Sequence, residues 1–458
     1  MNDDVNVLVL AAGHGSRMRS TTPKVLHRVA GKAMIDWVLD AVAPLLTQSK
    51  PITVIGVGAE SVQAHVGDRS DFVLQTEQLG TGHAVQQAQA KLGDNHGVTL
   101  IMSGDTPMFR PETLAEFVQT HQNSKNAVTV LTAIADDPTG YGRIVRADDD
   151  TVLKIVEQKD ASVTERRIQE INTGVYVFDN QLLFEALSQV KNNNAQGEYY
   201  LPDTLDILRQ SGHQIGAHTL HDFTESLGVN DRVALAVANR VMHERINHRL
   251  MVAGVELIDP ANTYIDADVT IGADTIVEGG VTILGHTTIG HNNVITQGSR
   301  IEDSQIGDDN VITASHIESA VLADRTTIGP YAHLRPKAEL GDAVHVGNFV
   351  EVKQAKLAAN TKAGHLTYIG NADVGESVNI GAGTIFVNYD GVNKFNTTVG
   401  DRAFIGSNTK LVAPVTIADE AITAAGSTIT ADVPTHAMGI ARARQVNKAD
   451  FWDRMPHK

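Results

Sequence analysis

Residues 265–301 read IDADVT-IGADTI-VEGGVT-ILGHTT-IGHNNV-ITQGSR-I, so an aliphatic residue begins every block of six. An α-helix repeats every 3.6 residues and an isolated strand every 2.0, and neither produces this spacing. A solenoid of hexapeptide repeats does, because each repeat points one aliphatic side chain inward and stacked repeats bury a continuous core. The C-terminal half is therefore expected to be an all-β parallel β-helix rather than a sandwich with regularly spaced turns.

The same period recurs further along the chain. After a slip of one residue it resumes at Ile306 and Ile312, and two later runs span residues 328–352 and 399–429. Glycine often follows the aliphatic residue, as in Ile405-Gly406. From Ala431 to Lys458 the period is lost, and we expect a tail that packs on a neighbour or frays.

The N-terminal half alternates apolar segments with amphipathic ones. Helical patterns cover residues 33–46 and 82–92. The segments expected to be buried strands are 5–10, 52–57, 72–74, 99–102, 128–134 and 175–178. This alternation predicts an α/β fold with a mostly parallel, Rossmann-like sheet, in which ligands bind beyond the carboxyl ends of the strands.

The change of period sets the expected domain organisation. Residues 1–230 form the α/β domain and residues 251–458 form the β-helix with its tail. Between them, residues 231–250 have a helical pattern rich in arginine and histidine, which predicts a linker helix with a solvated basic face.

Composition narrows the class of protein. The 458 residues suffice for two or three domains, and 42% hydrophobic with 20% charged residues is an ordinary globular balance. A net charge of −17 argues against non-specific nucleic-acid binding, although local cations can still hold anionic small molecules. The absence of cysteine excludes disulfides, thiolate metal sites and a cysteine nucleophile. The acidic start does not resemble a signal peptide, and no run approaches the ~18 apolar residues of a membrane span, so a soluble cytoplasmic protein is expected.

A glycine-rich loop follows the first expected strand. Residues 10–18 read LAAGHGSRM and residues 23–26 read PKVL. Glycines after a strand let backbone N–H groups approach a phosphate, and Arg17 and Lys24 can neutralise a triphosphate and the charge that develops when it is attacked. The loop is neither a P-loop, which needs Gly-Lys-Ser/Thr, nor a good Rossmann fingerprint.

The full string resembles the signature of the sugar-phosphate nucleotidyltransferases, and supporting segments follow in the same order. LGTGHA at 79–84 is similar to the family's base-reading segment and SGD at 103–105 to its metal segment. YGR at 141–143, IVE at 155–157, EINTG at 170–174 and GVN at 228–230 match the subgroup that handles N-acetylglucosamine 1-phosphate. Taken singly, an aspartate at a strand end is often a helix cap and an asparagine often a turn residue.

This resemblance implies specific roles. Arg17 and Lys24 are catalytic, Asp105 and Asn230 hold Mg²⁺, and the sugar is contacted by Gly142, Glu157 and Asn172. The residues implied to bind nucleotide or sugar nucleotide are Leu10, Ala11, Ala12, Gly13, Lys24, Gln75, Gly80, Thr81, Ser103, Gly104, Asp105, Gly142, Glu157, Asn172 and Asn230.

Polar, cationic and aromatic residues interrupt the hexapeptide repeat between residues 330 and 391, where a purely structural coil needs only small outward residues. NYDG at 388–391 predicts a loop that projects from the coil. With KAGHLTY at 362–368, these segments resemble the acetyltransferase half of the bifunctional N-acetylglucosamine-1-phosphate uridyltransferase/glucosamine-1-phosphate acetyltransferase family. Together with the N-terminal motifs, the match covers nearly the whole chain and implies a left-handed β-helix.

By the same resemblance, His365 is the base that takes a proton from the glucosamine amine, a task that suits an imidazole. Arg335 and Lys353 bind the 1-phosphate. The residues implied to hold the sugar and order the thioester are Tyr368, Asn379, Asn388 and Tyr389, and those implied to contact acetyl-CoA are Ala382, Asn388, Tyr389, Ser407, Ala425 and Arg442. His333 has no matching role and is interpreted as structural, and Phe386 stands where some relatives carry cysteine.

The implied function is a bifunctional enzyme. It acetylates glucosamine 1-phosphate with acetyl-CoA and then couples N-acetylglucosamine 1-phosphate to UTP with Mg²⁺, giving UDP-N-acetylglucosamine for bacterial cell-wall and lipopolysaccharide synthesis. A homotrimer is implied because acetyl-CoA sites in the family use residues from adjacent β-helices, and neither nucleic acid nor membrane is an expected partner.

Two alternatives remain open from the sequence. One is a monofunctional nucleotidyltransferase whose β-helix only oligomerises or senses an effector. The other is a non-catalytic assembly protein, against which the presence of Arg17, Lys24 and Asp105 argues. The choice of UTP over dTTP rests on the resemblance.

Overall fold

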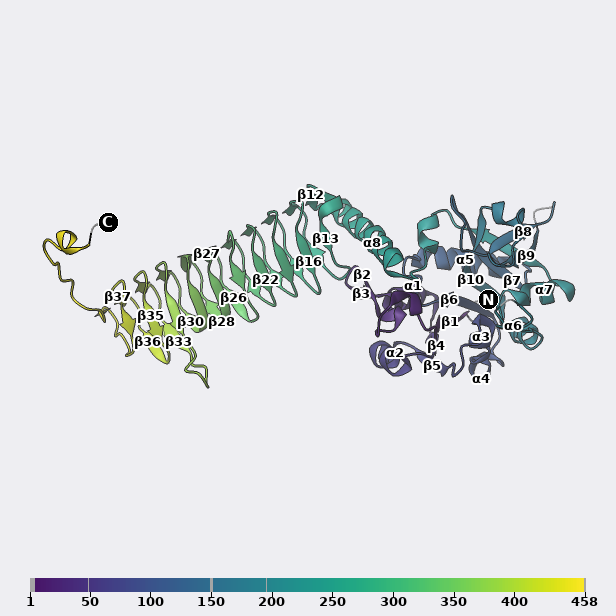
Figure 1. Ribbon diagram of the computed structural model, residues 1–458, viewed down its shortest axis with the longest axis horizontal. Helices are drawn as coiled ribbons and strands as arrows, with labels where there is room; N and C mark the ends of the chain where they lie inside the picture. The colour runs from purple at the N-terminus through teal and green to yellow at the C-terminus, as the bar shows by residue number, and fades with distance from the viewer. Residues whose placement is uncertain (1–4, 48, 149–150, 195, 457–458) are drawn as a thin grey trace. The chain divides into compact units, whose positions relative to one another are not determined.

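The computed structural model describes residues 5–47, 49–148, 151–194 and 196–456, and the chain divides into two compact units, Met1–Met242 and His243–Lys458. The first is built around a mixed α/β sheet and the second is a stack of flat β coils (Figure 1). Helix α8 (Arg232–Val252) contains the division between the units.

The sheet of the first unit has the strand order β11-β7-β10-β6-β1-β4-β5, and a pair of short strands, β8 and β9, extends it beside β10. Strand β10 runs antiparallel to both neighbours, and the remaining pairs along the order are parallel, so the expected mostly parallel sheet is confirmed. The strands are β1 (Val5–Ala11), β4 (Ile52–Ile55), β5 (Asp71–Leu74), β6 (Val98–Ser103), β7 (Val128–Ile134), β8 (Arg143–Arg146), β9 (Val152–Val156), β10 (Glu170–Asp179) and β11 (Ile215–Thr219).

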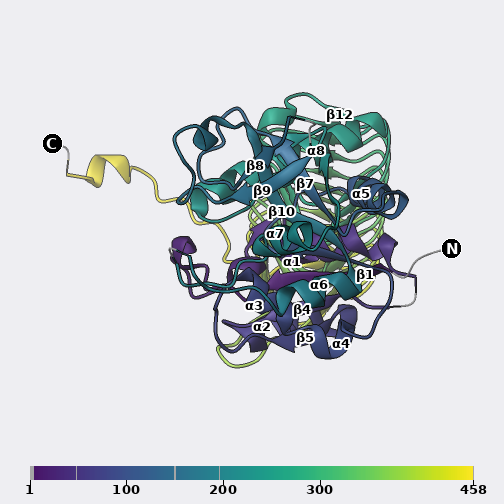
Figure 2. The same cartoon turned by 90° about the vertical axis from the view of Figure 1, so that its right-hand side faces the viewer.

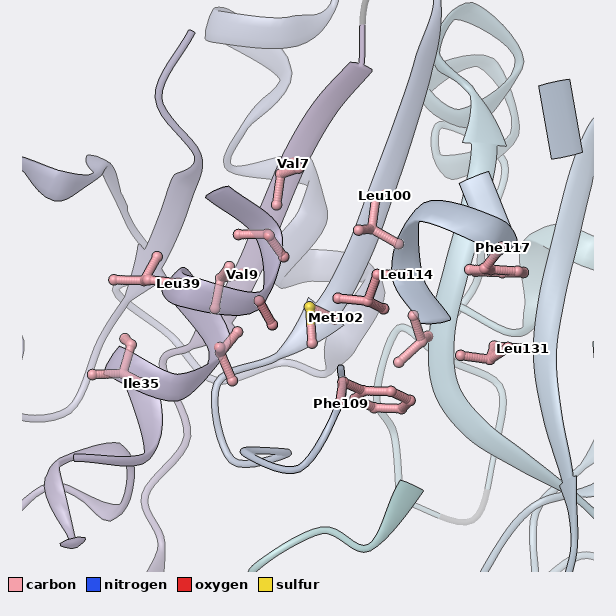
Figure 3. Packing of buried hydrophobic residues seen from close by; sticks show 14 of the residues in the cluster. Val7, Val9, Ile35, Leu39, Leu100, Met102, Phe109, Leu114, Phe117 and Leu131 are labelled. Carbon is pink, nitrogen blue, oxygen red and sulfur yellow. The ribbon is translucent and has the colours of Figure 1, made fainter. Parts of the chain in front are cut away.

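Helices cover both faces of this sheet. One face packs against α1 (Met34–Val42), α2 (Ala59–Val66) and α5 (Pro111–Asn123). Figure 3 shows side chains of α1 and α5 packed against those of β1, β6 and β7. The other face packs against α3 (Thr81–Gln86), α4 (Gln89–Leu92), α6 (Asn180–Leu187) and α7 (Asp203–Gln210). Burial on both faces explains why the central strands are continuous apolar runs.

The second unit is a left-handed β-helix, whose coils the period of six predicts and whose hand the family resemblance implies. An 11-stranded sheet runs from β12 (Glu256–Leu257) to β39 (Met438–Gly439), and a 17-stranded sheet from β13 (Tyr264–Ile265) to β38 (Thr428–Ile429) forms the other two faces. Successive coils pair in parallel with inward residues in register, as in Ile283 opposite Ile301. Ile283 and Ile301 are both fully buried, so the core is one aliphatic column per face.

The structure fills one stretch of the coil that the sequence analysis left unassigned and corrects one expectation. Between Ile312 and Ile328 the inward positions are Ile317 and Leu322, at steps of five residues, which a strict six-residue count misses. The coil also continues past Ala431, because β39 pairs with β37 (Ile422–Thr423). Beyond β39 the chain leaves the stack of coils, as the yellow segment in Figure 2 shows.

No helix in the described part of the chain is long and apolar enough to cross a membrane.

Phe386 tests the packing of the coil. It lies in β32 (Ile385–Val387), pairs with Leu411 on the next coil and is completely buried. Replacing Phe386 with alanine should lower the free energy of unfolding of the β-helix by about 3–5 kcal/mol, because the cavity forms in an aliphatic column that cannot collapse. The measurement is urea unfolding of the full chain followed by far-UV circular dichroism. Ile385→Ala, at an exposed neighbouring position, is the matched control and should change this energy by less than about 0.5 kcal/mol.

Candidate active sites

The loop after β1 brings a lysine close to the first strand. Gly15 adopts a left-handed φ of 58°, and a Cβ there would lie 2.7 Å from Cβ of Lys24. Glycine at position 15 therefore allows the segment η2 (Lys24–Leu26) to pack against the loop, with Lys24 directed across the end of β1.

Four side chains that are distant in the sequence meet at this end of the sheet. The Arg17 guanidinium donates to Oδ1 of Asn230 at 2.8 Å. The Lys24 ammonium forms an ion pair with Oδ2 of Asp105 and lies 3.2 Å from Oδ1 of Asn230. The sequence-predicted catalytic cations and metal-binding oxygens thus form a single cluster, and it stands where β1 and β6 both end.

A cavity of about 350 Å³ adjoins this cluster. Its lining includes most of the residues predicted for the nucleotide: Leu10, Ala11, Ala12, Gly13, Lys24, Gln75, Gly80, Thr81, Ser103 and Asp105. Gly104 lies behind the lining, where its N–H donates to the carbonyl of Leu10 at 2.9 Å. The predicted nucleotide residues are therefore gathered in one place.

The far wall of this cavity is a segment held against Tyr199. Gln75 is buried and donates through Nε2 to the carbonyl of Gly80 at 3.2 Å. The Tyr199 N–H donates to the carbonyl of Leu79, and the Gly82 N–H donates to the carbonyl of Tyr199, each at 2.8 Å. Gly80 has a φ of 108°, and a Cβ there would lie 2.6 Å from the Tyr199 carbonyl oxygen, so only glycine fits this close approach.

A second cavity of about 570 Å³ borders the first. Leu10, Thr81, Ser103 and Glu198 line both. Three further predicted residues, Arg17, Glu157 and Asn172, line the second cavity but not the first. Two adjoining cavities with the cation cluster at their border suit two reacting partners of which at least one is anionic.

The predicted sugar residues support one another. The Asn172 N–H donates to the carbonyl of Gly142 at 2.9 Å, and the Asn172 side chain donates to the Tyr176 hydroxyl at 2.6 Å. A Cβ at Gly142 would lie 3.1 Å from Oε1 of Glu157, so the glycine leaves room for that carboxylate. Burial, reinforced by the negative charges of Asp160 and Asp203, raises the pKa of Glu157 above its ordinary value, while Arg143 opposes the shift.

In the β-helix, cationic side chains converge on neighbouring strands. β25 (His333–Leu334) and β28 (Glu351–Leu357) lie side by side, and Arg335 donates through Nη1 to Oε1 of Glu351 at 2.7 Å. The positive charges of Arg335 and then Lys394 lower the pKa of Lys353. The positive charges of Arg335, Lys353 and Lys394 repel one another, and a bound dianion would relieve that repulsion.

His365 ends strand β29 (Lys362–His365) opposite Asn348, and its side chain is exposed. The next residue, Leu366, has a φ of 48°, so the backbone turns a corner directly after the imidazole. Tyr368 starts β30 (Tyr368–Val374) opposite Glu351, and Asn379 in β31 (Asn379–Ile380) lies opposite Lys362. The predicted base therefore lies on the coil next to the one that carries Lys353.

The expected projecting loop is present. An antiparallel bridge joins Tyr389 to Lys394, and the residues between them are exposed. At its base, the buried side chain of Asn388 donates to Oδ1 of Asn371 at 2.7 Å and lies 3.5 Å from the Tyr368 hydroxyl. The bridge returns the chain so that Lys394 reaches Lys353.

Four of the residues predicted for acetyl-CoA follow successive coils, namely Ala382, Ser407, Ala425 and Arg442. The carbonyl of Ala382 accepts from the Asn408 N–H at 2.7 Å, and the carbonyl of Ser407 accepts from the Gly426 N–H at 2.8 Å. Ala382, Ser407 and Ala425 therefore form a column along one edge of the coil. Arg442 follows Ala441, whose carbonyl accepts from the Thr428 N–H at 3.1 Å. The column of small side chains and the exposed Arg442 suit an elongated ligand that lies along the stack.

Comparisons with known proteins agree with both halves. A family model described as nucleotidyl transferase matches residues 6–224, one described as the GMPPB C-terminal domain matches 257–362, and the bacterial transferase hexapeptide model of six repeats matches 396–431. The bifunctional protein GlmU of Lactobacillus delbrueckii subsp. bulgaricus is 56% identical over 98% of this chain and 97% of its own length. Those of Streptococcus agalactiae and Streptococcus mutans are 54% and 55% identical, each over 98% of both chains.

The chain belongs to the bifunctional GlmU family. Membership confirms the predicted family, the two fold classes and an enzyme that is both a nucleotidyltransferase and an acetyltransferase. The resemblance drawn from the glycine loop and the KAGHLTY segment thus identified the GlmU family correctly.

The structure also places residues at both candidate sites that the sequence analysis missed. Glu198 lines both N-terminal cavities, and the backbone of Tyr199 supports the Gly80 segment. Lys394 joins the cations of the β-helix. Of these residues, only Lys394 could have been predicted from the sequence, because a lysine that closely follows NYDG would lie where the loop returns to the coil.

Proposed function

We propose that this chain makes UDP-N-acetylglucosamine in two steps at two separate sites. The C-terminal unit acetylates glucosamine 1-phosphate, and the N-terminal unit couples the product to UTP. The observation that carries the proposal is the meeting of Arg17, Lys24, Asp105 and Asn230 at the border of two adjoining cavities. We further propose domains at residues 1–230 and 251–458, with 231–250 as the linker.

Uridyl transfer proceeds by in-line attack. A phosphate oxygen of N-acetylglucosamine 1-phosphate forms a bond to the α-phosphorus of UTP, and the bond from that phosphorus to the β-phosphate oxygen breaks, which releases pyrophosphate. The nucleophile is already an anion, so no general base is needed. Arg17 and Lys24 position the phosphates and neutralise the charge that develops, which is the main contribution a protein makes to phosphoryl transfer.

The side chains at the border of the cavities fit Mg²⁺. Oδ2 of Asp105 and Oδ1 of Asn230 both approach the same ammonium, so two hard oxygen donors converge. Mg²⁺ usually binds only a few protein oxygens of this kind, and substrate phosphates complete its coordination. Asp105 and Asn230 would hold the ion, which when bound supplies charge neutralisation of the phosphates.

Acetyl transfer uses His365 as a base. The imidazole accepts a proton from the ammonium of glucosamine 1-phosphate, because only the neutral amine attacks the thioester carbonyl. The carbon–nitrogen bond forms and the carbon–sulfur bond breaks; the nitrogen gives up its second proton to solvent, and the departing sulfur takes the proton from the His365 imidazolium, so that CoA leaves as the thiol. Arg335 and Lys353 hold the 1-phosphate, Tyr368 and Asn379 hold the sugar, and Asn388 and Tyr389 order the thioester. The rest of acetyl-CoA lies along the column of Ala382, Ser407 and Ala425 and contacts Arg442.

We propose a homotrimer as the working assembly. The imidazole of His365 is exposed, and so are Tyr331, Phe349 and Leu366 at the edge beside it. The rings of Tyr331 and Phe349 stack at 5.6 Å. A neighbouring β-helix against this apolar edge would enclose the acetyltransferase site.

Gly80 offers a test of the nucleotide cavity. Gly80→Ala should raise the KM for UTP by at least about tenfold, because the new Cβ displaces the Tyr199 backbone and moves the wall that Gln75 supports. Gly212→Ala is the matched control: its φ is 87°, and nothing lies within 4 Å of its Cβ position. Steady-state kinetics should show an unchanged KM for UTP in that control, and equal effects of the two substitutions would contradict the proposed wall.

Glu157 gives the sugar site a pH dependence. Because burial raises its pKa, this carboxylate takes up a proton at a higher pH than an ordinary glutamate does. Protonation removes an acceptor for sugar hydroxyls, so the KM for N-acetylglucosamine 1-phosphate should rise as the pH falls through that range. Glu157→Gln should raise this KM at neutral pH and remove the acid-side inflection. An inflection that persists in the variant would assign the titration to another group.

The decisive experiment is a product assay on the purified protein with glucosamine 1-phosphate, acetyl-CoA, UTP and Mg²⁺. The proposal predicts CoA release, pyrophosphate release and UDP-N-acetylglucosamine. Pyrophosphate from the pre-acetylated sugar without CoA from the free amine would make the β-helix a scaffold. If dTTP replaces UTP with equal efficiency, the base assignment is wrong.

A further inference from the structure

A group of two histidines and one glutamate stands on the β-helix next to Arg335, and none of the three has a role in the proposed function. His316 and Glu318 lie on β22 (His316–Glu318), and His333 lies in register with His316 on the adjacent parallel strand β25. Residues two apart on a strand point to the same face, so all three side chains project together. The imidazole rings stack at a centroid separation of 4.8 Å with an interplanar angle of 6°.

The ligand atoms of this group are close enough to share an ion. One nitrogen from each imidazole and one carboxylate oxygen all lie within 4.8 Å of one another, and Nε2 of His333 lies 2.9 Å from Oε1 of Glu318. A zinc ion holds nitrogen and oxygen ligands at about 2.0–2.2 Å, which places them roughly 3.0–3.6 Å apart. Small rotations of these half-buried side chains would reach that spacing.

Glu318 differs from the carboxylates on nearby coils in its hydrogen-bond partner, while Arg300 lies in register with His316 on the preceding coil. Glu302, one coil before Glu318, accepts from Arg300 at 2.6 Å, and Glu351, two coils after Glu318, accepts from Arg335 at 2.7 Å. Each of these two carboxylates is therefore matched by a guanidinium. Glu318, between them, has an imidazole as its hydrogen-bond partner. An imidazole can exchange a hydrogen bond for a metal bond, which a guanidinium cannot.

We propose that His316, Glu318 and His333 form a binding site for a divalent transition-metal ion, of which Zn²⁺ is the best match, with water in the remaining position. Two imidazoles and one carboxylate suit zinc, whereas Mg²⁺ and Ca²⁺ prefer oxygen ligands. The site differs in donor type from the Asp105–Asn230 oxygen pair proposed for Mg²⁺. One chain would thus bind two kinds of metal at chemically distinct sites.

The test is a calorimetric titration of the untagged full chain with Zn²⁺ in the presence of excess Mg²⁺. The expected result is one zinc per chain that His316→Gln, His333→Gln and Glu318→Gln each weaken at least about tenfold. His436→Gln is the matched control, because His436 lies 3.1 Å from Glu420 in an ion pair and, within the described part of the chain, belongs to no group of three possible metal ligands. Equal zinc affinity in wild type and the His316 and His333 variants, or no binding by wild type, would overturn the proposal.

A second measurement needs no variant. Diethyl pyrocarbonate modifies accessible imidazoles, and peptide mass spectrometry locates the products. In wild type, Zn²⁺ should protect His316 and His333 at least about tenfold and leave His436 unprotected, because only the first two would have a ring nitrogen bound to metal. Protection of all three, or of none, would contradict the assignment.

Discussion

Replacing His365 with alanine should lower kcat for acetylation of glucosamine 1-phosphate by about 10²–10⁴-fold, the range expected when a general base is removed. The amine would then lose its proton only to water or buffer. Uridyl transfer to pre-acetylated sugar should be unaffected, because that reaction is assigned to residues of the other unit. The measurement is CoA release with the free amine, run beside pyrophosphate release with N-acetylglucosamine 1-phosphate.

The control for this prediction is another exposed histidine of the β-helix. His286→Gln changes an imidazole that lies 3.8 Å from Asp268 and has no assigned role, so its CoA release should match that of wild type. Wild-type rates in His365→Ala would reduce the residue to a structural part of the corner before Leu366.

Replacing Asp105 with asparagine should lower kcat for uridyl transfer by about 10³-fold, which corresponds to about 4 kcal/mol of transition-state stabilisation. The substitution keeps the shape of the side chain but removes the charge that balances Lys24 and would hold the metal. Acetyl transfer should continue, so the variant should accumulate N-acetylglucosamine 1-phosphate and release CoA without pyrophosphate.

Two further measurements separate a metal ligand from a merely structural aspartate. Raising Mg²⁺ should recover part of the activity of Asp105→Asn, and calorimetry should show weaker Mg²⁺ binding in the presence of UTP. Asp206→Asn, on the exposed side of α7, should match wild type in both. Normal Mg²⁺ affinity combined with lost activity would assign Asp105 to positioning Lys24 instead.

The larger features of the fold were predictable because burial imposes a period. The step of six followed from inward aliphatic positions such as Ile283 and Ile301, and the parallel sheet followed from runs such as Val128–Ile134, which the structure gives as β7. The five-residue steps at Ile317 and Leu322 were missed because a coil can shorten at a corner without changing which residues point inward. Periodicity reports burial, not the path of the chain between buried positions.

The candidate sites were predictable in part for a different reason. Arg17, Lys24 and Asp105 stand in motifs, but Glu198 contributes to the cavities only because the chain after β10 folds back across the sheet. The zinc proposal had no sequence signal, since His316 and His333 are 17 positions apart and meet because the strands pair in register. To predict such a pairing from the sequence, one must know where each coil begins.

The stacking of the coils also determines where local unfolding of the β-helix begins. Each coil contacts mainly the coils before and after it, so opening the last coil breaks one interface, whereas opening a central coil breaks two. Local unfolding should therefore spread inward from β39, and amide exchange should be fastest at that end. Ala425 and Arg442 lie at this end, so acetyl-CoA would bind where the coil opens most readily and hold it closed.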